Sequence, residues 1–420
     1  MRRHATSGLP FRSRTQTGID VVTTEEGDKP NMTMPEPGPG SAAAALAAFR
    51  ADLPLKAPNA RSLAATIENP GCTARRVLDS AGVDKVALAT RIGTPLPQEQ
   101  SVFAINRGNR FEADLKADDY AALIELLRQA KFKVDRVEIL RLRNLYPISP
   151  RNPDIALEKR AAATRSAILG MAAGESSAPN LIDGGALRWD FGGAVARLET
   201  DGIAWRLGGR IHIIEIKSFP LVDGRGDPEK VGAAAWQAAV YVSAITDMLA
   251  EQGFDTNLVS TEVLLVCPRN TSLTPTMAPL DVARQTRSLR RLLAGRRQVG
   301  DVLAALGDDA TLDTDGMSAA TAATHLADVL ERLGTNYLPS CLAACPLAYH
   351  CRDRARATGN PACLGPEVRT SLAGVQSLPR VLELAVGASP GAGESDAAAM
   401  LMRAARLLRA ADSSTLVGAR

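Results

Sequence analysis

The sequence lacks any long apolar run, since no stretch approaches the ~18 consecutive apolar residues that a membrane-spanning helix needs. Its first residues are basic, but no apolar segment follows them, so we expect no secretory signal, no membrane partner and a cytoplasmic location. Lysine and arginine number 49 and aspartate and glutamate 46, which leaves a formal charge of only +3. This balance excludes a strongly basic nucleic-acid-binding domain, so any DNA contact must come from a local patch.

Aromatic residues are also scarce, at 4% of the 420 residues, and the sequence contains no internal repeat. The core must therefore be built mainly from Ala, Leu, Val and Ile, and a chain of this length can bury a sizeable one. Residues 1–40 are polar and rich in Thr, Pro and Gly, so we expect a disordered tail there. We expect one main domain over 41–365, with its core at about 105–270, and a helical, partly disordered tail over 366–420.

The hydrophobic pattern changes its period along the chain and predicts an α/β fold. Helices are predicted over 41–51, 60–92 with a break at 69–71, 108–131, 154–173, 227–250, 279–294, 318–334 and 395–411. Strands are predicted over 133–145, in four short runs between 186 and 219, and over 258–268. The order of helix, several strands, helix and strand predicts a mixed central sheet flanked by helices.

Six cysteines are present, and four of them fall within 23 positions near the C-terminus. Clustered cysteines in a reducing compartment indicate metal or cluster binding rather than disulfides. The spacing C-x₃-C-x₅-C over 341–351 supplies three thiolates, and Cys363, Cys72 or His350 could supply a fourth ligand. Zinc and an iron–sulfur cluster both suit such ligands. Cys267 lies in the apolar run LLVCP and is predicted to be a buried core thiol.

The run RIHIIEIKSF over 210–219 places an acid and a base on one face of an apolar strand. Glu215 and Lys217 are two residues apart, so they point the same way. Burying such groups is costly unless they pair or bind a metal. The glutamate can ligate Mg²⁺ or Mn²⁺ for phosphodiester hydrolysis, while the lysine stabilises charge or orients the attacking water. A simple cross-strand salt bridge is the alternative interpretation.

Two more acids precede this strand, and two polar residues follow it. Asp201 stands fourteen residues before Glu215, and a hairpin of that length can bring the two carboxylates together to hold a divalent cation. Glu199 could serve in its place, or both acids could belong to an ordinary polar turn. Gln237 and Tyr241 are four residues apart on the next helix and share one of its faces.

In their order along the chain, Asp201, Glu215-x-Lys217 and Gln237-x-x-x-Tyr241 resemble the RecB-like branch of the PD-(D/E)XK nucleases. The resemblance covers about residues 65–365 and implies a restriction-endonuclease-like core. It also implies that Lys217 assists the attacking hydroxide or the transition-state charge, and that Gln237 and Tyr241 position a DNA strand.

That branch carries an earlier helix with a glycine and, four residues later, an acid or a histidine that ligates the metal. The stretch RGNRFEADL supplies Gly108 and Glu112 at this spacing. Many relatives have histidine at the second position, so a carboxylate departs from the commoner form while still suiting the metal. The resemblance thus implies a Mg²⁺ or Mn²⁺ site formed by Glu112, Asp201, Glu215 and the main-chain carbonyl of Ile216.

Several RecB-like nucleases, such as the AddB subunit of bacterial recombination nucleases and the small CRISPR-associated exonucleases, hold a [4Fe–4S] cluster. They use one cysteine before the nuclease core and three after it. The resemblance implies that Cys72, in NPGCTARRVL, joins Cys341, Cys345 and Cys351, although the first gap is x₃ here and x₂ in those relatives. Zinc held by the last three together with Cys363 is the alternative.

The residues and the resemblance together predict a Mg²⁺- or Mn²⁺-dependent deoxyribonuclease. We expect an exonuclease or DNA-end-processing enzyme of repair, recombination or defence that acts on single-stranded DNA or DNA ends. Because the sequence shows no helicase motif, unwinding would need a helicase or another defence or recombination partner. Arg284, Arg287 and Arg291 give one helix a basic face that tracks a phosphate backbone or is merely solvated. A non-catalytic iron–sulfur DNA-binding or scaffold subunit is the alternative function, and a zinc-ribbon protein is a third.

Overall fold

The computed structural model describes residues 42–97, 102–132, 137–149, 153–190, 195–294, 299–307, 310–359, 361–372 and 374–417. The tail expected over 1–40 lies outside these residues. Within the described ranges, none of the helices is both long and apolar enough to cross a membrane.

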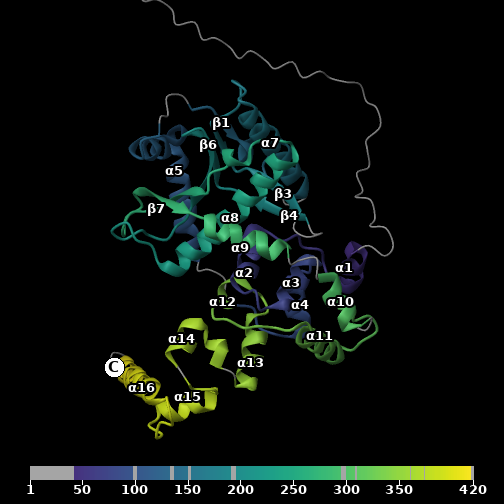
Figure 1. Cartoon of the computed structure of the whole chain (residues 1–420), viewed down its shortest axis with the longest axis vertical. Helices are drawn as coiled ribbons and strands as arrows, with labels where there is room; N and C mark the ends of the chain where they lie inside the picture. The colour runs from purple at the N-terminus through teal and green to yellow at the C-terminus, as the bar shows by residue number, and fades with distance from the viewer. Residues whose placement is uncertain are drawn as a thin grey trace, which may run out of the picture. The chain divides into compact units, whose positions relative to one another are not determined.

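A six-stranded mixed sheet, with strand order β1-β2-β5-β6-β7-β8, carries the candidate site (Figure 1). Its strands are β1 (Ile139–Arg141), β2 (Leu181–Asp183), β5 (Gly202–Leu207), β6 (Arg210–Ile216), β7 (Glu262–Pro268) and β8 (Pro275–Asp281). The pairs β1–β2 and β6–β7 are parallel, and the other three pairs are antiparallel. Strands β3 (Ala186–Asp190) and β4 (Val195–Glu199) form a separate antiparallel pair. The predicted mixed α/β fold with a mixed central sheet is confirmed.

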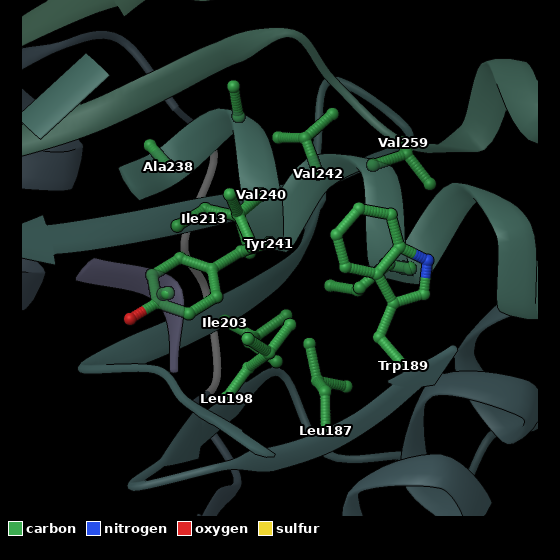
Figure 2. Close-up of a cluster of buried hydrophobic side chains, with 14 of the residues drawn as sticks. Leu187, Trp189, Leu198, Ile203, Ile213, Ala238, Val240, Tyr241, Val242 and Val259 are labelled. Carbon is green, nitrogen blue, oxygen red and sulfur yellow. The ribbon is translucent and has the colours of Figure 1, made fainter. Parts of the chain in front are cut away.

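Strand β6 is apolar on both faces because helices cover both sides of the sheet. Ile211 and Ile213 enter a core with α7 (Pro153–Ala173) and α8 (Pro228–Glu251), whereas Ile214 enters a core with α5 (Val102–Gln129). Figure 2 shows part of the first core, where Tyr241 of α8 directs its hydroxyl away from Trp189. Since side chains alternate along a strand, Glu215 shares the α8 face with Ile213.

Helix α8 begins where the sequence predicts. Asp227 accepts hydrogen bonds from the backbone N–H groups of Glu229, at 3.0 Å, and Lys230, at 3.2 Å. Pro228 occupies the first turn, where its missing N–H costs nothing. These two signals confirm the predicted N-terminus of the helix that faces Glu215.

A second group of helices forms a core apart from the sheet. Its members are α1 (Ala42–Arg50), α3 (Thr73–Ser80), α4 (Lys85–Ile92), α10 (Val299–Leu306), α11 (Ala319–Leu333) and α13 (Ala348–Thr358). The short helix α12 (Cys341–Ala344) lies between α11 and α13 in the chain. Helix α2 (Ala60–Glu68) contacts α8 as well as α3 and α12, so it joins the two cores. The last helices, α14 (Pro366–Ser371), α15 (Leu378–Ala385) and α16 (Ser395–Val417), share a small core of their own. The remaining elements are α6 (Leu142–Leu145), α9 (Ala283–Ala294), η1 (Thr256–Leu258) and η3 (Pro361–Leu364).

The helix expected over 108–131 is interrupted just after Lys116. Ala117 is extended, and Asp118, Asp119 and Tyr120 adopt left-handed backbone angles, with φ of 49°, 54° and 64°. Aspartate tolerates this conformation better than most residues, which lets two acids in a row end a helix that the apolar spacing alone would continue.

Other predicted limits of helices and strands were also wrong. The strand expected from 258 begins at Glu262, because 256–258 form a short 3₁₀ helix. The strand expected to run to residue 145 ends at Arg141, because 142–145 form the helical turn α6. The helix expected from 279 begins at Ala283, because 275–281 form the edge strand β8. Its two prolines hide the strand signal, and an edge strand tolerates them. The segment 60–92 forms three helices rather than two.

Candidate functional site

Glu215 lies at the end of β6 and is completely buried. Its Oε1 is 2.5 Å from Lys217 Nζ, yet neither carboxylate oxygen receives a well-aligned hydrogen bond within the described chain. Burial raises the pKa of Glu215 to about 7, against the opposing effect of Lys217. The Lys217 ammonium compensates part of the charge of this buried carboxylate, and the oxygen that does not contact Lys217 suits a metal ion.

Asp201 reaches the same strand end from the turn before β5. Its Oδ2 accepts a hydrogen bond from the Ile216 N–H at 2.8 Å. Burial raises the pKa of Asp201, with Glu112 adding to the rise and Lys217 opposing it. Arg143 connects Asp201 to Glu112, because its Nη2 lies 4.0 Å from Asp201 Oδ1 and its Nη1 lies 2.6 Å from Glu112 Oε1.

Glu199 is directed elsewhere. Its side chain is 45% exposed and pairs with Arg160 Nη1 at 3.4 Å. The structure therefore brings Asp201, and not Glu199, to Glu215. The difference arises from which sheet each strand joins, because Glu199 ends β4 in the separate pair whereas Asp201 directly precedes β5 beside β6.

Helix α5 delivers Glu112 to the site. The helix passes close to the end of β6 at Gly108, where an added Cβ would lie 3.5 Å from Ser218 Oγ. One turn later, Glu112 Oε1 is 2.6 Å from both Lys116 Nζ and Arg143 Nη1. Burial alone would raise the pKa of Glu112, but Lys116 and Arg143 together lower it below its ordinary value.

A chain of hydrogen bonds leads from Lys217 into the core. Lys217 Nζ donates to Gln237 Oε1 at 3.0 Å, and Gln237 Nε2 donates to the Tyr241 hydroxyl at 2.9 Å. That hydroxyl donates to the Glu199 carbonyl at 2.6 Å. Tyr241 is only 2% exposed, so it holds Gln237 in place and offers no surface to a DNA strand, contrary to the sequence expectation (Figure 2).

The sequence did not single out three residues of the network around Glu112, namely Lys116, Asp183 and Arg143. Asp183, at the end of β2, is buried and accepts from Lys116 Nζ at 2.6 Å. Arg143 approaches over Gly184, whose φ is positive and where any Cβ would overlap the arginine side chain. The available signals were the i, i+4 spacing of Glu112 and Lys116 and the position of Asp183 at a strand end before two glycines.

The site opens on a cleft of about 1560 Å³. Glu112, Lys217 and Gln237 contribute to its walls, and so do residues 338–340, 343–344 and 364–365 from the cysteine-bearing segment. Arg61 and Arg107 add positive charge to its lining. The predicted basic face of α9 is also present, since Arg284, Arg287 and Arg291 are exposed, but these three do not line the cleft.

Four of the cysteines face one another. Burial raises the pKa of the Cys351 thiol, and the nearby Cys345, Cys72 and Cys341 raise it further. Burial also raises the pKa of Cys363, with Arg356 opposing the rise. The structure therefore brings together the four cysteines that the resemblance implies as cluster ligands.

Polar side chains tie the two cysteine-bearing segments to each other. Asn69 Nδ2 donates to the Asn336 carbonyl at 2.7 Å and lies 3.6 Å from Cys341 Sγ. Arg75 Nη2 donates to the Ala344 carbonyl at 2.8 Å. These contacts join parts of the chain that are more than 260 residues apart.

The sixth cysteine behaves as predicted. Cys267 is fully buried among apolar residues of β7 and α8, and burial raises its pKa to about 12. Such a thiol is a small apolar core residue rather than a ligand.

The donor types suit both expected groups, although the side chains are not arranged around an ion. In the part of the chain that the structure describes, no three Cys, His, Asp or Glu side chains form a group that could hold a metal ion as they stand. Carboxylate oxygens without hydrogen-bond donors, as in Glu215, suit Mg²⁺ or Mn²⁺. Four facing thiols suit a thiolate-bound cluster or zinc.

Comparison with known proteins adds little. No family model and no curated protein matches the chain. One solved structure, described as "Crystal structure of SSO0001", is similar over 41% of this chain and 84% of its own, with 18% identity and a TM-score of 0.15. A likeness this low supports no conclusion on fold or function.

Proposed function

We propose that the protein is a divalent-metal-dependent deoxyribonuclease of the RecB-like PD-(D/E)XK type. One observation supports this most strongly: Asp201 and Lys217 lie beside the buried Glu215, and Arg143 links Asp201 to Glu112. A carboxylate set with an adjacent lysine at the edge of a cleft is suited to hydrolysis of a phosphodiester.

Each residue has a distinct role in this proposal. Glu112, Asp201, Glu215 and the Ile216 carbonyl would hold Mg²⁺ or Mn²⁺. When bound, such an ion lowers the pKa of a water molecule and stabilises charge on the phosphate. Lys217, which lines the cleft, presents its ammonium group to the phosphate and to the attacking hydroxide.

Gln237 positions Lys217 rather than acting on the substrate itself. Its amide oxygen accepts from the ammonium group, and its amide nitrogen is fixed by the Tyr241 hydroxyl. This series of hydrogen bonds ends at the Glu199 carbonyl, which belongs to the backbone of strand β4. Lysine orientation is thereby tied to the sheet, and orientation of a charged group is a large part of electrostatic catalysis.

The substrate is DNA, as a single strand or a strand end, bound in the cleft with exonuclease or end-processing action in repair, recombination or defence. Arg61, Arg107 and Lys217 would contact the phosphate backbone there, in a lining whose four cationic side chains are balanced by four glutamates. Unwinding of duplex DNA falls to a helicase or another partner protein.

Cys72, Cys341, Cys345 and Cys351 would hold a [4Fe–4S] cluster. The proximity of Cys72, Cys341 and Cys345 to Cys351 supports this set. The cluster would link the segments on either side of the sheet domain and stabilise the fold rather than take part in hydrolysis. Iron and sulfide analysis of anaerobically purified protein tests this, with zinc and no iron as the contrary result.

Cleavage of end-labelled single- and double-stranded DNA in Mn²⁺ tests the nuclease proposal. We expect Glu215→Gln to abolish cleavage. Glu262 is an exposed acid at the other end of the β6–β7 pair, so Glu262→Gln should leave cleavage intact. Cleavage by Glu215→Gln at the wild-type rate would falsify the proposal. DNA binding without cleavage in any metal would indicate the non-catalytic subunit instead.

A further inference from the structure

We infer that the Lys116 ammonium is a built-in cation that takes the place of a second divalent ion, so that the candidate site binds one metal ion. The inference rests on the proposed function and extends it to the number of ions used. Two-ion sites are common in phosphodiester hydrolysis, so the number of ions is a real distinction.

Lys116 lies between two carboxylates as a bound cation would. Its Nζ is 2.6 Å from Glu112 Oε1 and 2.6 Å from Asp183 Oδ1. Glu112 is an expected metal ligand, and Asp183 is 5% exposed, so the lysine occupies the space between a ligand and a buried acid. A second divalent ion bound between these two acids would have to expel the ammonium group.

The chain is shaped to keep Lys116 in this position. Lys116 is the last residue before the backbone of α5 leaves the helical conformation, and three left-handed residues follow it. Left-handed non-glycine residues are strained and persist where the surroundings hold them. Here Arg141 pairs with Asp119 at 2.6 Å, and Tyr120 is buried beside Asp183. The strained turn thus fixes where the helix that carries Lys116 ends. It also places Tyr120 beside Asp183, the second carboxylate that Lys116 contacts.

The charges of the site also favour a single ion. The acids are Glu112, Asp183, Asp201 and Glu215. The cations among them are Lys116, Arg143 and Lys217, and they leave one net negative charge. One divalent ion and one phosphodiester bring the total to zero, whereas two ions would leave two positive charges uncompensated at a largely buried site.

Counting bound Mn²⁺ by equilibrium dialysis, with Mn²⁺ electron paramagnetic resonance as a second readout, tests the inference. The full chain should bind one ion, and Lys116→Met, which keeps the length but removes the charge, should bind two. The Mn²⁺ resonance of Lys116→Met should show coupling between neighbouring ions. Lys116→Arg and the cleft-lining control Lys230→Met should both bind one. Glu215→Gln gives the background from other sites.

Two ions in the wild type would overturn the inference while leaving the nuclease proposal intact. One ion in Lys116→Met, in protein shown to be folded by its circular dichroism, would also overturn it. No ion above the Glu215→Gln background in the wild type would instead contradict the proposed function, and this inference with it.

Discussion

The carboxylate site and the cysteine region are assembled in different ways. The acids sit at strand ends, so the backbone ladders of β2, β5 and β6 bring Asp183, Asp201 and Glu215 together. The cysteines come from segments more than 260 residues apart, which are joined by side-chain contacts such as those of Asn69 and Arg75. Backbone ladders are cooperative, whereas a few side-chain bonds are each worth only about 1 kcal/mol. The two cysteine-bearing segments also share an apolar core, and the proposed cluster would add a further link between them.

The largest expected effect is on the stability of the cysteine region. If Cys72 holds the proposed cluster, Cys72→Ser removes a link that closes a loop of about 270 residues and should lower the free energy of unfolding by about 5 kcal/mol. Cys363→Ser is the matched control and should cost far less, because the proposed cluster does not use Cys363. Anaerobic urea unfolding followed by circular dichroism measures both. Equal losses in the two variants would remove the distinction between the cysteines.

The next effect belongs to the carboxylate site alone. Lys217→Met should lower kcat by roughly 10²–10³-fold, as removal of a group that stabilises transition-state charge does. Lys230→Met, from the same cleft, should alter KM and leave kcat near that of the wild type. Steady-state cleavage kinetics separate the two, and an unchanged kcat in Lys217→Met would show that the lysine is only a salt-bridge partner.

The core behind the site should contribute through packing. Leu198 is fully buried in the cluster of Figure 2, and Leu198→Ala should destabilise the protein by about 3 kcal/mol through the cavity it leaves. Val195→Ala, at the exposed start of the same strand, should change stability by less than about 0.5 kcal/mol. If the two regions are separate, iron content will be unaffected by Leu198→Ala. Loss of iron in that variant would show that the cysteine region depends on the sheet core.

Metal binding should depend on pH because of Glu215. Its folded pKa is raised to about 7, so below that pH a bound metal must displace a proton, and above it the carboxylate is already charged. The Mn²⁺ affinity should fall about tenfold for each pH unit below 7 and level off above it. Calorimetric titrations at pH 6, 7 and 8 measure this. Affinity that is flat from pH 6 to 8 would mean that Glu215 is not a ligand.

The smallest expected effect is that of Tyr241→Phe. Loss of the hydroxyl removes its bond to the Glu199 carbonyl and its support of Gln237, at a cost of about 1 kcal/mol in stability. Because Tyr241 acts through Gln237 and Lys217, kcat should fall less than in Lys217→Met, with KM unchanged. A change in KM alone would instead indicate contact with the substrate.

Much of this arrangement follows from local sequence signals. Asp227 and Pro228 predict the start of α8, and strand alternation places Glu215 and Lys217 on one face. The Gln237 and Tyr241 pair is likewise found by helical spacing. Each of these predictions depends only on residues within one element.

The rest depends on contacts between elements. Asp201 rather than Glu199 reaches Glu215 because their strands join different sheets. Asp183 lies at the site because β2 pairs with β5. The break after Lys116 arises from consecutive left-handed residues held by Arg141 and by burial of Tyr120, which periodicity cannot reveal.

Cleavage of labelled DNA by Asp201→Asn and Glu199→Gln tests the central claim most directly, because the two acids are neighbours in sequence but only Asp201 reaches Glu215. In Mn²⁺, Asp201→Asn should be inactive, and Glu199→Gln should cleave at the wild-type rate. Full activity in Asp201→Asn, or an equal loss in both variants, would contradict the assignment of the carboxylate site as a metal-dependent nuclease centre.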